Sequence, residues 1–261
     1  MDTSEATAVG LRPDERIDTV NEQIRLIQKK QGLTFGTDAF LLAAYVRPQR
    51  HATAVDLGSG TGIVSLLLAG RQKAKKIYAV ELQPEFAELI ERNSALNGMA
   101  DRILPLCADA RTLKPVDTEG EVDLVLSNPP YMRTDSGERN RCDEKYIARH
   151  EVFGSVHDFC EAGGRLLRHG GRFVCVFRPD RLSELMEALR DAMLEPKRMT
   201  FVHADAASEP CMVLTEAVKG AAPSLRVSPP LLLYLPQAAD GNRRILTPEA
   251  QAVYDGCRLF Y

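Results

Sequence analysis

Several features that mark whole classes of protein are missing from this chain of 261 residues. It has no apolar run near the roughly 20 residues of a membrane-spanning helix. The polar residues 1–22 hold no apolar segment of the kind found in secretory signals. Its five histidines show no metal-ligand spacing. These absences argue against a membrane partner, a secreted protein and a metal site.

Paired cysteines and excess basic charge are missing as well. None of the six cysteines belongs to a C-x-x-C pair, and Cys107, Cys175 and Cys211 lie in apolar, strand-like stretches. They are expected to be buried free thiols, which favours a reducing, cytoplasmic location. The formal net charge of −3 gives no overall basic excess. Bulk charge therefore does not favour an extended nucleic-acid-binding surface and leaves room only for a local basic patch.

Short apolar stretches alternate with helical patterns through most of the chain. Strands are expected at residues 52–57, 77–81, 103–107, 122–126, 172–177, 199–203 and 211–218. Helices are expected between most of them. Such alternation predicts an α/β fold, with a mostly parallel sheet covered by helices on both faces. The sequence shows neither an internal repeat nor a linker, so one domain is expected.

The ends of the chain carry weaker patterns. Residues 24–28 are expected to form a strand that pairs with 33–35 as a hairpin, after a charged, turn-like stretch at 12–18. Further along, Gly170-Gly171 is expected to end a helix. The tail is expected to hold an extended stretch from Pro229 to Tyr234 and a short helix from Pro248 to Asp255.

The stretch Val55-Asp56-Leu57-Gly58-Ser59-Gly60-Thr61-Gly62 joins a predicted strand to a predicted helix. Backbone N–H groups and a helix N-terminus at such a turn can receive a ligand, and glycine allows close approach and a positive φ. The dinucleotide fingerprint is not matched, because Ile63 stands at its third glycine position. The spacing instead resembles the turn that binds S-adenosylmethionine (SAM), with Asp56 facing the amino-acid end of the cofactor. A turn without a ligand and an NAD site are the alternatives.

Acidic residues follow the next two predicted strands. Glu81 lies about 20 residues after Gly60, where an acid can accept hydrogen bonds from both ribose hydroxyls. Leu82 beside it is counted in the same site. Asp109, together with the backbone N–H of Ala110, can bind the adenine amine. The alternative for each acid is a solvent-exposed strand end.

Asn128-Pro129-Pro130-Tyr131 follows a fourth core strand and is expected at the carboxyl edge of the sheet. A planar amine conjugated to a ring is a weak nucleophile because its lone pair is delocalised. The side-chain carbonyl of Asn128 and the backbone carbonyl of Pro129 can accept its two N–H groups. The prolines fix the backbone, and Tyr131 offers a ring for stacking. Methyl transfer would then depend mainly on orientation. A stiff turn without chemistry is the alternative.

Residues 56–62 and 128–131 together resemble the SAM-dependent amino-methyltransferases, which act on adenine N6, cytosine N4, guanine N2 or a glutamine amide. Other stretches resemble the bacterial tRNA1(Val) (adenine-37-N6)-methyltransferase family. These are residues 24–28, 35–39 with Leu41-Leu42, 148–151, and 229–231 with Tyr234. The likeness runs from about residue 11 to about residue 256.

This resemblance implies a Rossmann-like methyltransferase fold whose sheet has seven strands, the last of them antiparallel. The expected division is an N-terminal hairpin and helix over the cofactor site (1–50), a Rossmann-like core (51–218) and a C-terminal tail (219–261). The resemblance also implies SAM as cofactor and tRNA as substrate. Phe35, Thr37 and Asp38 would lie over SAM, although Asp38 could also serve only as a helix cap. Asn128 would contact both SAM and the substrate.

Other functions stay open at this point. The glutamine N5-methyltransferases of release factors share both motifs, but they carry a helical domain before the glycine turn, where this chain has only residues 1–51. A SAM-fold nucleic-acid-binding protein without catalysis is a second alternative, and the intact residues 128–131 argue against it. Residues 132–149 are expected to form a functional or mobile loop. The sequence leaves open whether Arg149, His150, Glu151 and the basic cluster at 71–76 contact RNA. It does not indicate an oligomeric state.

Overall fold

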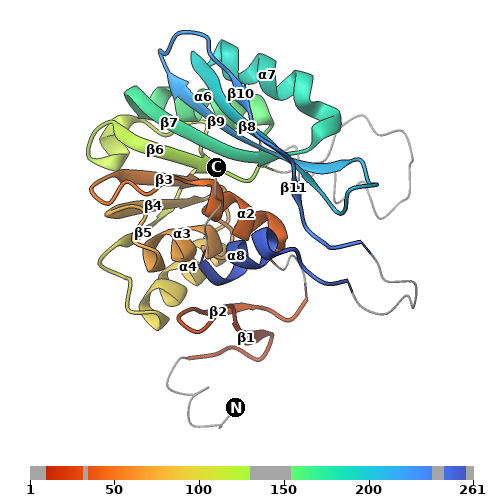
Figure 1. Ribbon diagram of the computed structural model, residues 1–261. Helices are drawn as coiled ribbons and strands as arrows, with labels where there is room; N and C mark the ends of the chain where they lie inside the picture. Colours follow the sequence, from red (N-terminus) through yellow and green to blue (C-terminus); the bar gives the residue numbers. More distant parts are fainter. Residues whose placement is uncertain (1–9, 32–34, 130–153, 237–243, 257–261) are drawn as a thin grey trace, which may run out of the picture.

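The computed structural model describes residues 10–31, 35–129, 154–236 and 244–256. These residues form one large sheet with helices on both faces and a separate two-stranded hairpin (Figure 1). The strands are β1 (Glu15–Thr19), β2 (Arg25–Lys29), β3 (Thr53–Leu57), β4 (Lys76–Glu81), β5 (Ile103–Cys107), β6 (Val122–Ser127), β7 (Leu167–Phe177), β8 (Leu194–His203), β9 (Pro210–Lys219), β10 (Arg226–Val227) and β11 (Leu231–Leu232). The α-helices are α2 (Thr37–Tyr45), α3 (Ile63–Gly70), α4 (Pro84–Leu96), α6 (Val156–Leu166), α7 (Leu182–Asp191) and α8 (Pro248–Gly256).

The sheet confirms the predicted fold class. Its seven long strands run in the order β5-β4-β3-β6-β7-β9-β8, and β9 is antiparallel to both of its neighbours. The tail adds β10 and β11, which pair with β8 in parallel, so the whole sheet has nine strands. The chain order reverses between β3 and β6, and a ligand site is expected at the carboxyl ends of such neighbouring strands.

Apolar side chains form one layer on each face of the sheet. The first layer contains α2, α3 and residues of α8 and β2, and the second contains α6 and α7. Every residue from Ala39 to Val46 is buried. The sheet lies on one side of α2, and α8 with Ala250 and Val253 packs in the same cluster. The expected tail elements, an extended stretch and a short helix, are therefore confirmed as parts of the fold.

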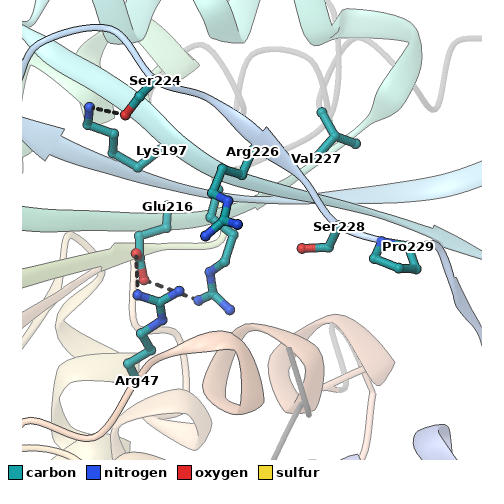
Figure 2. Close-up of a pocket in the computed structure, with 9 residues that line it drawn as sticks. Arg47, Lys197, Glu216, Ser224, Arg226, Val227, Ser228 and Pro229 are labelled. Carbon is teal, nitrogen blue, oxygen red and sulfur yellow. Dashed lines mark hydrogen bonds and ion pairs between the residues drawn. The ribbon is translucent and has the colours of Figure 1, made fainter.

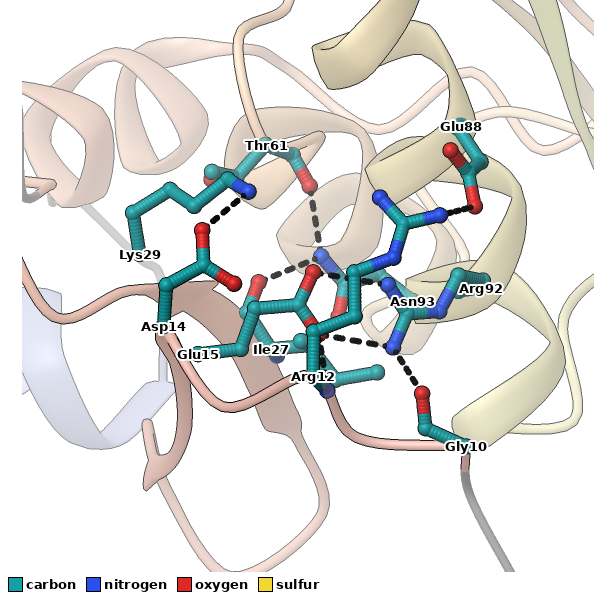
Figure 3. Close-up of polar contacts among 10 residues, drawn as sticks. All are labelled: Gly10, Arg12, Asp14, Glu15, Ile27, Lys29, Thr61, Glu88, Arg92 and Asn93. Carbon is teal, nitrogen blue, oxygen red and sulfur yellow. Dashed lines mark hydrogen bonds and ion pairs between the residues drawn. The ribbon is translucent and has the colours of Figure 1, made fainter.

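The N-terminal hairpin differs from the prediction. β2 pairs with β1, with Glu15 opposite Lys29, so the charged stretch at 12–18 contributes a strand rather than a turn. The prediction failed because polar contacts hold this hairpin to α4 (Figure 3). Glu15 forms an ion pair with Arg92 at 2.8 Å, and the Glu15 side chain is fully buried. The predicted partner strand, 33–35, lies largely outside the described residues.

Glycines near α6 also behave differently from the prediction. Gly170 and Gly171 lie inside β7 and do not end the preceding helix, because the strand begins directly at Leu167. The register between β6 and β7 shifts near this point. Within α6, a Cβ added to Gly163 would lie 2.5 Å from the ring of Phe173. Glycine there allows the helix to approach β7 closely.

The cysteine prediction is partly wrong. Cys160 and Cys175 are buried free thiols, and burial raises the pKa of Cys175 to about 12. Cys107 and Cys211 are also free thiols but are exposed, because each lies at the end of a strand. In the described part of the chain, the helices are all too short or too polar to cross a membrane.

Candidate active site

The glycine-rich turn lies at the carboxyl end of β3 and adopts a conformation that glycine favours. Gly58, Gly60 and Gly62 have φ values of +71°, +56° and +83°. The N–H groups of Gly58 and Ser59 donate to the carbonyl of Val80 at 3.0 and 2.9 Å, which fixes the turn against β4. A Cβ added to Gly60 would meet no atom within 4 Å. The backbone at Gly60 is therefore open to an approaching ligand.

Asp56 supports this turn from inside. Its carboxylate accepts hydrogen bonds from the hydroxyls of Ser59 at 2.6 Å and Ser65 at 2.7 Å. The residue is only 2% exposed, and burial raises the pKa of its carboxyl against the opposing effect of the two hydroxyls. The structure thus places Asp56 behind the turn, where it holds Ser59. The predicted contact of Asp56 with the amino-acid end of the cofactor stays a prediction beside this supporting role.

Glu81 holds the opposite side of the turn. Its two carboxylate oxygens accept hydrogen bonds from the N–H of Gly60 and the N–H of Gln83, each at 2.9 Å. The residue is 6% exposed, and Leu82 next to it is half-buried. A carboxylate fixed beside open backbone can accept hydrogen bonds from the hydroxyls of a ribose. The turn and Glu81 therefore fit the nucleoside part of SAM.

Asp109 and Ala110 lie on the neighbouring strand end, since Glu81 pairs with Cys107 across β4 and β5. The guanidinium of Arg111 donates to both oxygens of Asp109 at 2.6 to 3.0 Å. This contact lowers the pKa of the Asp109 carboxyl. Asp109, the predicted acceptor for the adenine amine, is therefore paired with Arg111. Sequence reasoning missed this partner.

Asn128 directly follows β6, and its side chain meets the start of α2. Its Nδ2 donates to Oδ2 of Asp38 at 2.8 Å. Because a carboxylate only accepts, the amide must turn its nitrogen toward Asp38. Its carbonyl oxygen Oδ1 is then the atom that can accept a hydrogen bond from an amine. Asp38 also caps its own helix, since its Oδ1 accepts from the N–H of Ala39 at 2.9 Å.

Helix α8 secures the segment that carries Asp38. The hydroxyls of Thr37 and Tyr254 lie 2.8 Å apart. The ring of Tyr254 lies 4.9 Å from that of Phe40, which in turn lies 5.9 Å from Phe35. Phe35 and Thr37 therefore belong to a cluster closed by the tail. Sequence reasoning did not identify Tyr254, because its short helix showed no link to α2.

Asn93 is a second residue whose role sequence reasoning missed. It is fully buried on α4, and its amide nitrogen donates to the carbonyls of Thr61 at 2.9 Å and Ile27 at 3.0 Å (Figure 3). Its oxygen accepts from the N–H of Ile27 at 2.7 Å. Asn93 thus connects the hairpin to the glycine turn. An asparagine on an otherwise apolar helix face was the available signal.

The basic cluster at 71–76 serves mainly the fold. Lys73 is buried, and its ammonium donates to the carbonyls of Ala43, Ala44 and Val46 at 2.6, 3.1 and 2.8 Å. It therefore caps the C-terminus of α2. Arg71 donates to a carbonyl of α8, and Lys76 pairs with Glu119.

Several predicted residues lie outside the described residues. These are Pro130, Tyr131, the loop 132–149, Arg149, His150 and Glu151. Pro129 is described and buried. Within the described ranges, no group of three or more His, Cys, Asp or Glu side chains is arranged to hold a metal ion.

Comparison with known proteins identifies the family. Residues 42–136 match the TRM5/TYW2 methyltransferase domain. A tRNA1(Val) (adenine(37)-N6)-methyltransferase of Phocaeicola vulgatus is 30% identical over 195 residues, covering 74% of this chain and 80% of the relative. The chain belongs to the tRNA1(Val) (adenine(37)-N6)-methyltransferase family. A family member from Porphyromonas gingivalis is 27% identical over 201 residues, covering 75% of this chain and 78% of the relative.

Solved structures agree on the fold. A predicted O-methyltransferase from Agrobacterium tumefaciens matches with a TM-score of 0.67 and 22% identity, covering 85% of this chain and 98% of that one. The tRNA m1G37 methyltransferase of M. jannaschii matches with a TM-score of 0.54 and 17% identity, covering 80% and 58%. The protein is a SAM-dependent methyltransferase of this family, as the sequence motifs predicted.

Proposed function

We propose that this enzyme methylates the N6 amine of an adenine in tRNA. The observation that carries the proposal is the hydrogen bond between Asn128 and Asp38. Asn128 directly follows β6, the strand that pairs with β3 beside the glycine turn. It orients an amide oxygen at the carboxyl edge of the sheet, where β3, β4 and β6 end side by side. The names of the family members supply the substrate class.

Each residue receives a distinct role in this proposal. Glu81 accepts hydrogen bonds from the ribose, and the open backbone at Gly60 receives the cofactor. SAM bound there supplies an electrophilic methyl group on a positively charged sulfur. Asn128 Oδ1 and the Pro129 carbonyl accept the two N–H groups of the adenine amine, which turns its lone pair toward the methyl group. Asp38 holds the Asn128 amide in the orientation this requires.

The other predictions about the site also remain proposals, including the contacts of Phe35, Thr37, Asp38 and Asp56 with SAM. Tyr131 stacks on the target base, and Asp109 with Ala110 binds the adenine of SAM. The guanidinium of Arg111 bonds both carboxylate oxygens of Asp109. Asp109 must therefore accept the adenine amine through a lone pair that Arg111 does not use. We also propose that the chain forms one domain, since a single apolar cluster includes residues from Ile24 to Val253. A cytoplasmic location is proposed as well, because the four cysteines in the described residues are free thiols.

The test is transfer of tritiated methyl groups from SAM to total tRNA and, in parallel, to total protein. We expect N6-methyladenosine in the digested tRNA and no methylated glutamine in the protein fraction. The reverse pattern would support the release-factor alternative. SAM binding without incorporation into either would identify a catalytically silent protein.

The Asn128→Ala variant links the activity to the proposed site. We expect single-turnover methyl transfer to fall at least about 100-fold, because one preorganised contact at the reacting atom is commonly worth about 3 kcal/mol. SAM affinity should change little. Asn97→Ala is the matched control, since it removes an asparagine whose side chain bonds the backbone of Arg25 and joins the hairpin to α4, away from the proposed site. A rate for Asn128→Ala within about threefold of wild type would remove this residue from catalysis.

A further inference from the structure

A basic pocket lies beside the C-terminus of α2, apart from the glycine turn. It has a volume of about 530 Å³ and is formed by three parts of the chain: Arg47 two residues after α2, the paired strands β8 and β9, and the tail around β10. Its charged lining residues are Arg47, Lys197, Arg198, Glu216 and Arg226. Figure 2 shows Arg47, Glu216 and Arg226 extending toward a common space from these different elements. Ser224 and Ser228 add two hydroxyl groups to the lining.

Positive charge exceeds negative charge in this lining. Glu216 is the one acid, and its carboxylate lies 3.1 Å from Arg198 and 3.9 Å from Arg47. Arg226 is exposed and forms no ion pair or hydrogen bond through its side chain within the described residues. Lys197 donates to Ser224 at 2.9 Å, a neutral partner. Four cations therefore face a single carboxylate.

Arg198 is the fixed part of this pocket. It is only 6% exposed, donates to the carbonyl of Tyr45 at 2.6 Å, and stacks over the Tyr45 ring at 3.7 Å. Its Nε is buried without a hydrogen-bond partner. Glu216 is shared between Arg198 and Arg47, so the one carboxylate of the lining does not balance its cations, and additional negative charge in the pocket is favourable.

The pocket lies within reach of a substrate bound at Asn128. Asp38 lies in the first turn of α2 and Arg47 lies two residues beyond its last residue, which corresponds to about 14 Å at roughly 1.5 Å per residue. The strand spacings across the sheet give a similar distance. Glu216 pairs with Val174, which pairs with Leu126, so three strand spacings of roughly 4.8 Å separate Arg198 from the end of β6.

From this arrangement we infer that the pocket binds a backbone phosphate of the RNA substrate within a few nucleotides of the target adenine. This inference rests on the function proposed above. Arginine presents planar, paired donors that match phosphate oxygens, and hydroxyl groups such as that of Ser228 add further donors. At about 3.4 Å per stacked nucleotide, 14 Å corresponds to no more than about five nucleotides. The pocket also supplies the local basic patch that a chain of net charge −3 needs to hold RNA.

The test compares wild type with the double variant Arg47→Ala/Arg226→Ala, which leaves the buried Arg198 in place. Affinity for a methylatable tRNA is measured from about 0.05 to 0.3 M salt. We expect the double variant to bind about tenfold more weakly near 0.15 M salt. The slope of log K against log salt should flatten by about 1.4, the value for two lost contacts to single-stranded RNA. Arg190→Ala, an exposed arginine on α7, is the control and should match wild type.

A second measurement locates the phosphate. Single neutral methylphosphonate linkages are placed at each position within five nucleotides of the target adenine. One linkage should weaken wild-type binding about tenfold and leave the double variant unaffected, because the contact it removes is already absent there. Equal sensitivity of both proteins at every linkage would overturn the inference.

The outcomes also separate this inference from the proposed function. If wild type methylates tRNA but the double variant binds it with unchanged affinity and salt slope, the pocket does not contact RNA and the function stands. If inorganic phosphate raises the melting temperature of wild type only, while tRNA binding is equal in both, the pocket binds a free anion and the inference is wrong. If wild type neither binds nor methylates tRNA, both proposals fail.

Discussion

The amide nitrogen of Asn128 lies 2.8 Å from a carboxylate oxygen of Asp38, a residue 90 positions earlier in the chain. This contact joins the first turn of α2 to the end of β6. It brings the segment before the glycine turn to the proposed active site. Asp38, which the sequence predicts to be a helix cap or a cofactor contact, also holds the proposed catalytic amide through this hydrogen bond.

Replacing Asp38 should therefore affect the chemical step more than cofactor binding. We expect Asp38→Ala to lower the single-turnover rate about tenfold to 100-fold, because the Asn128 amide loses its fixed orientation. Asp38→Asn keeps one acceptor oxygen and should recover part of the rate. SAM affinity, measured by calorimetry, should stay within about threefold of wild type. A large loss of SAM affinity with an unchanged rate would assign Asp38 to the cofactor instead.

Gly60 and Gly98 provide a matched pair for testing the turn. Both have positive φ, +56° and +65°, and a Cβ added to either meets no atom within 4 Å. Alanine at either position should therefore cost about 1–2 kcal/mol of stability through backbone strain alone. Only Gly60→Ala should also weaken SAM binding, by at least about tenfold, because the methyl group occupies the space where the ligand approaches.

The two measurements for this pair are urea denaturation and calorimetric SAM titration. Similar losses of stability with a selective loss of SAM affinity in Gly60→Ala would locate the cofactor at the turn. Equal SAM affinity in both variants would show that the open backbone at Gly60 is not the binding surface.

Glu81 should contribute both to the turn and to the cofactor. Glu81→Ala removes the acceptor for the N–H groups of Gly60 and Gln83, and we expect SAM affinity to fall by about 1–3 kcal/mol. Glu85→Ala is the control, because it removes an exposed acid from the neighbouring first turn of α4. Unchanged SAM affinity in Glu81→Ala, measured by calorimetry, would exclude Glu81 from the site.

Local sequence patterns predicted the sheet and its ligand edge because they depend on short-range rules. Alternating apolar strands and helices indicated a parallel sheet, and the glycines of residues 58–62 indicated the turn. Both features follow from a few neighbouring residues. The resemblance to a known family supplied the substrate class and the antiparallel direction of the last strand, which local patterns alone did not contain.

Contacts between distant segments could not be predicted in the same way. Asn93, Lys73 and Tyr254 each act through partners more than 25 residues away. A buried lysine that caps α2 resembles a surface lysine in sequence, because only the folded chain brings three carbonyls around it. The prediction of the N-terminal hairpin was wrong for the same reason. The buried carboxylate of Glu15 is stable only with its ion-pair partner Arg92, which lies far away in the sequence.

The Glu15–Arg92 pair leads to a prediction about stability. Both carboxylate oxygens of Glu15 accept from Arg92 at 2.8 Å, and the Arg92 side chain is 18% exposed. We expect Glu15→Gln to lower the free energy of unfolding by about 2–3 kcal/mol at pH 7. This is less than the roughly 3–5 kcal/mol for a fully buried pair, because Arg92 retains some contact with water. Urea denaturation measures the loss.

The same pair predicts how stability depends on pH. Burial raises the pKa of the Glu15 carboxyl, but its contacts with Arg92 and the N–H of Arg12 outweigh this, so its pKa is lower than in the unfolded chain. A depressed pKa adds stability above the unfolded value of about 4.5, and this stability disappears as the pH falls through the lower folded value. The difference in stability between wild type and Glu15→Gln should therefore be constant near neutral pH and shrink below about pH 4.5. Glu119→Gln removes an exposed partner of Lys76 and should show almost no difference at any pH. A gap between wild type and Glu15→Gln that stays constant down to pH 3 would contradict the assignment of a charged, paired carboxylate at this position.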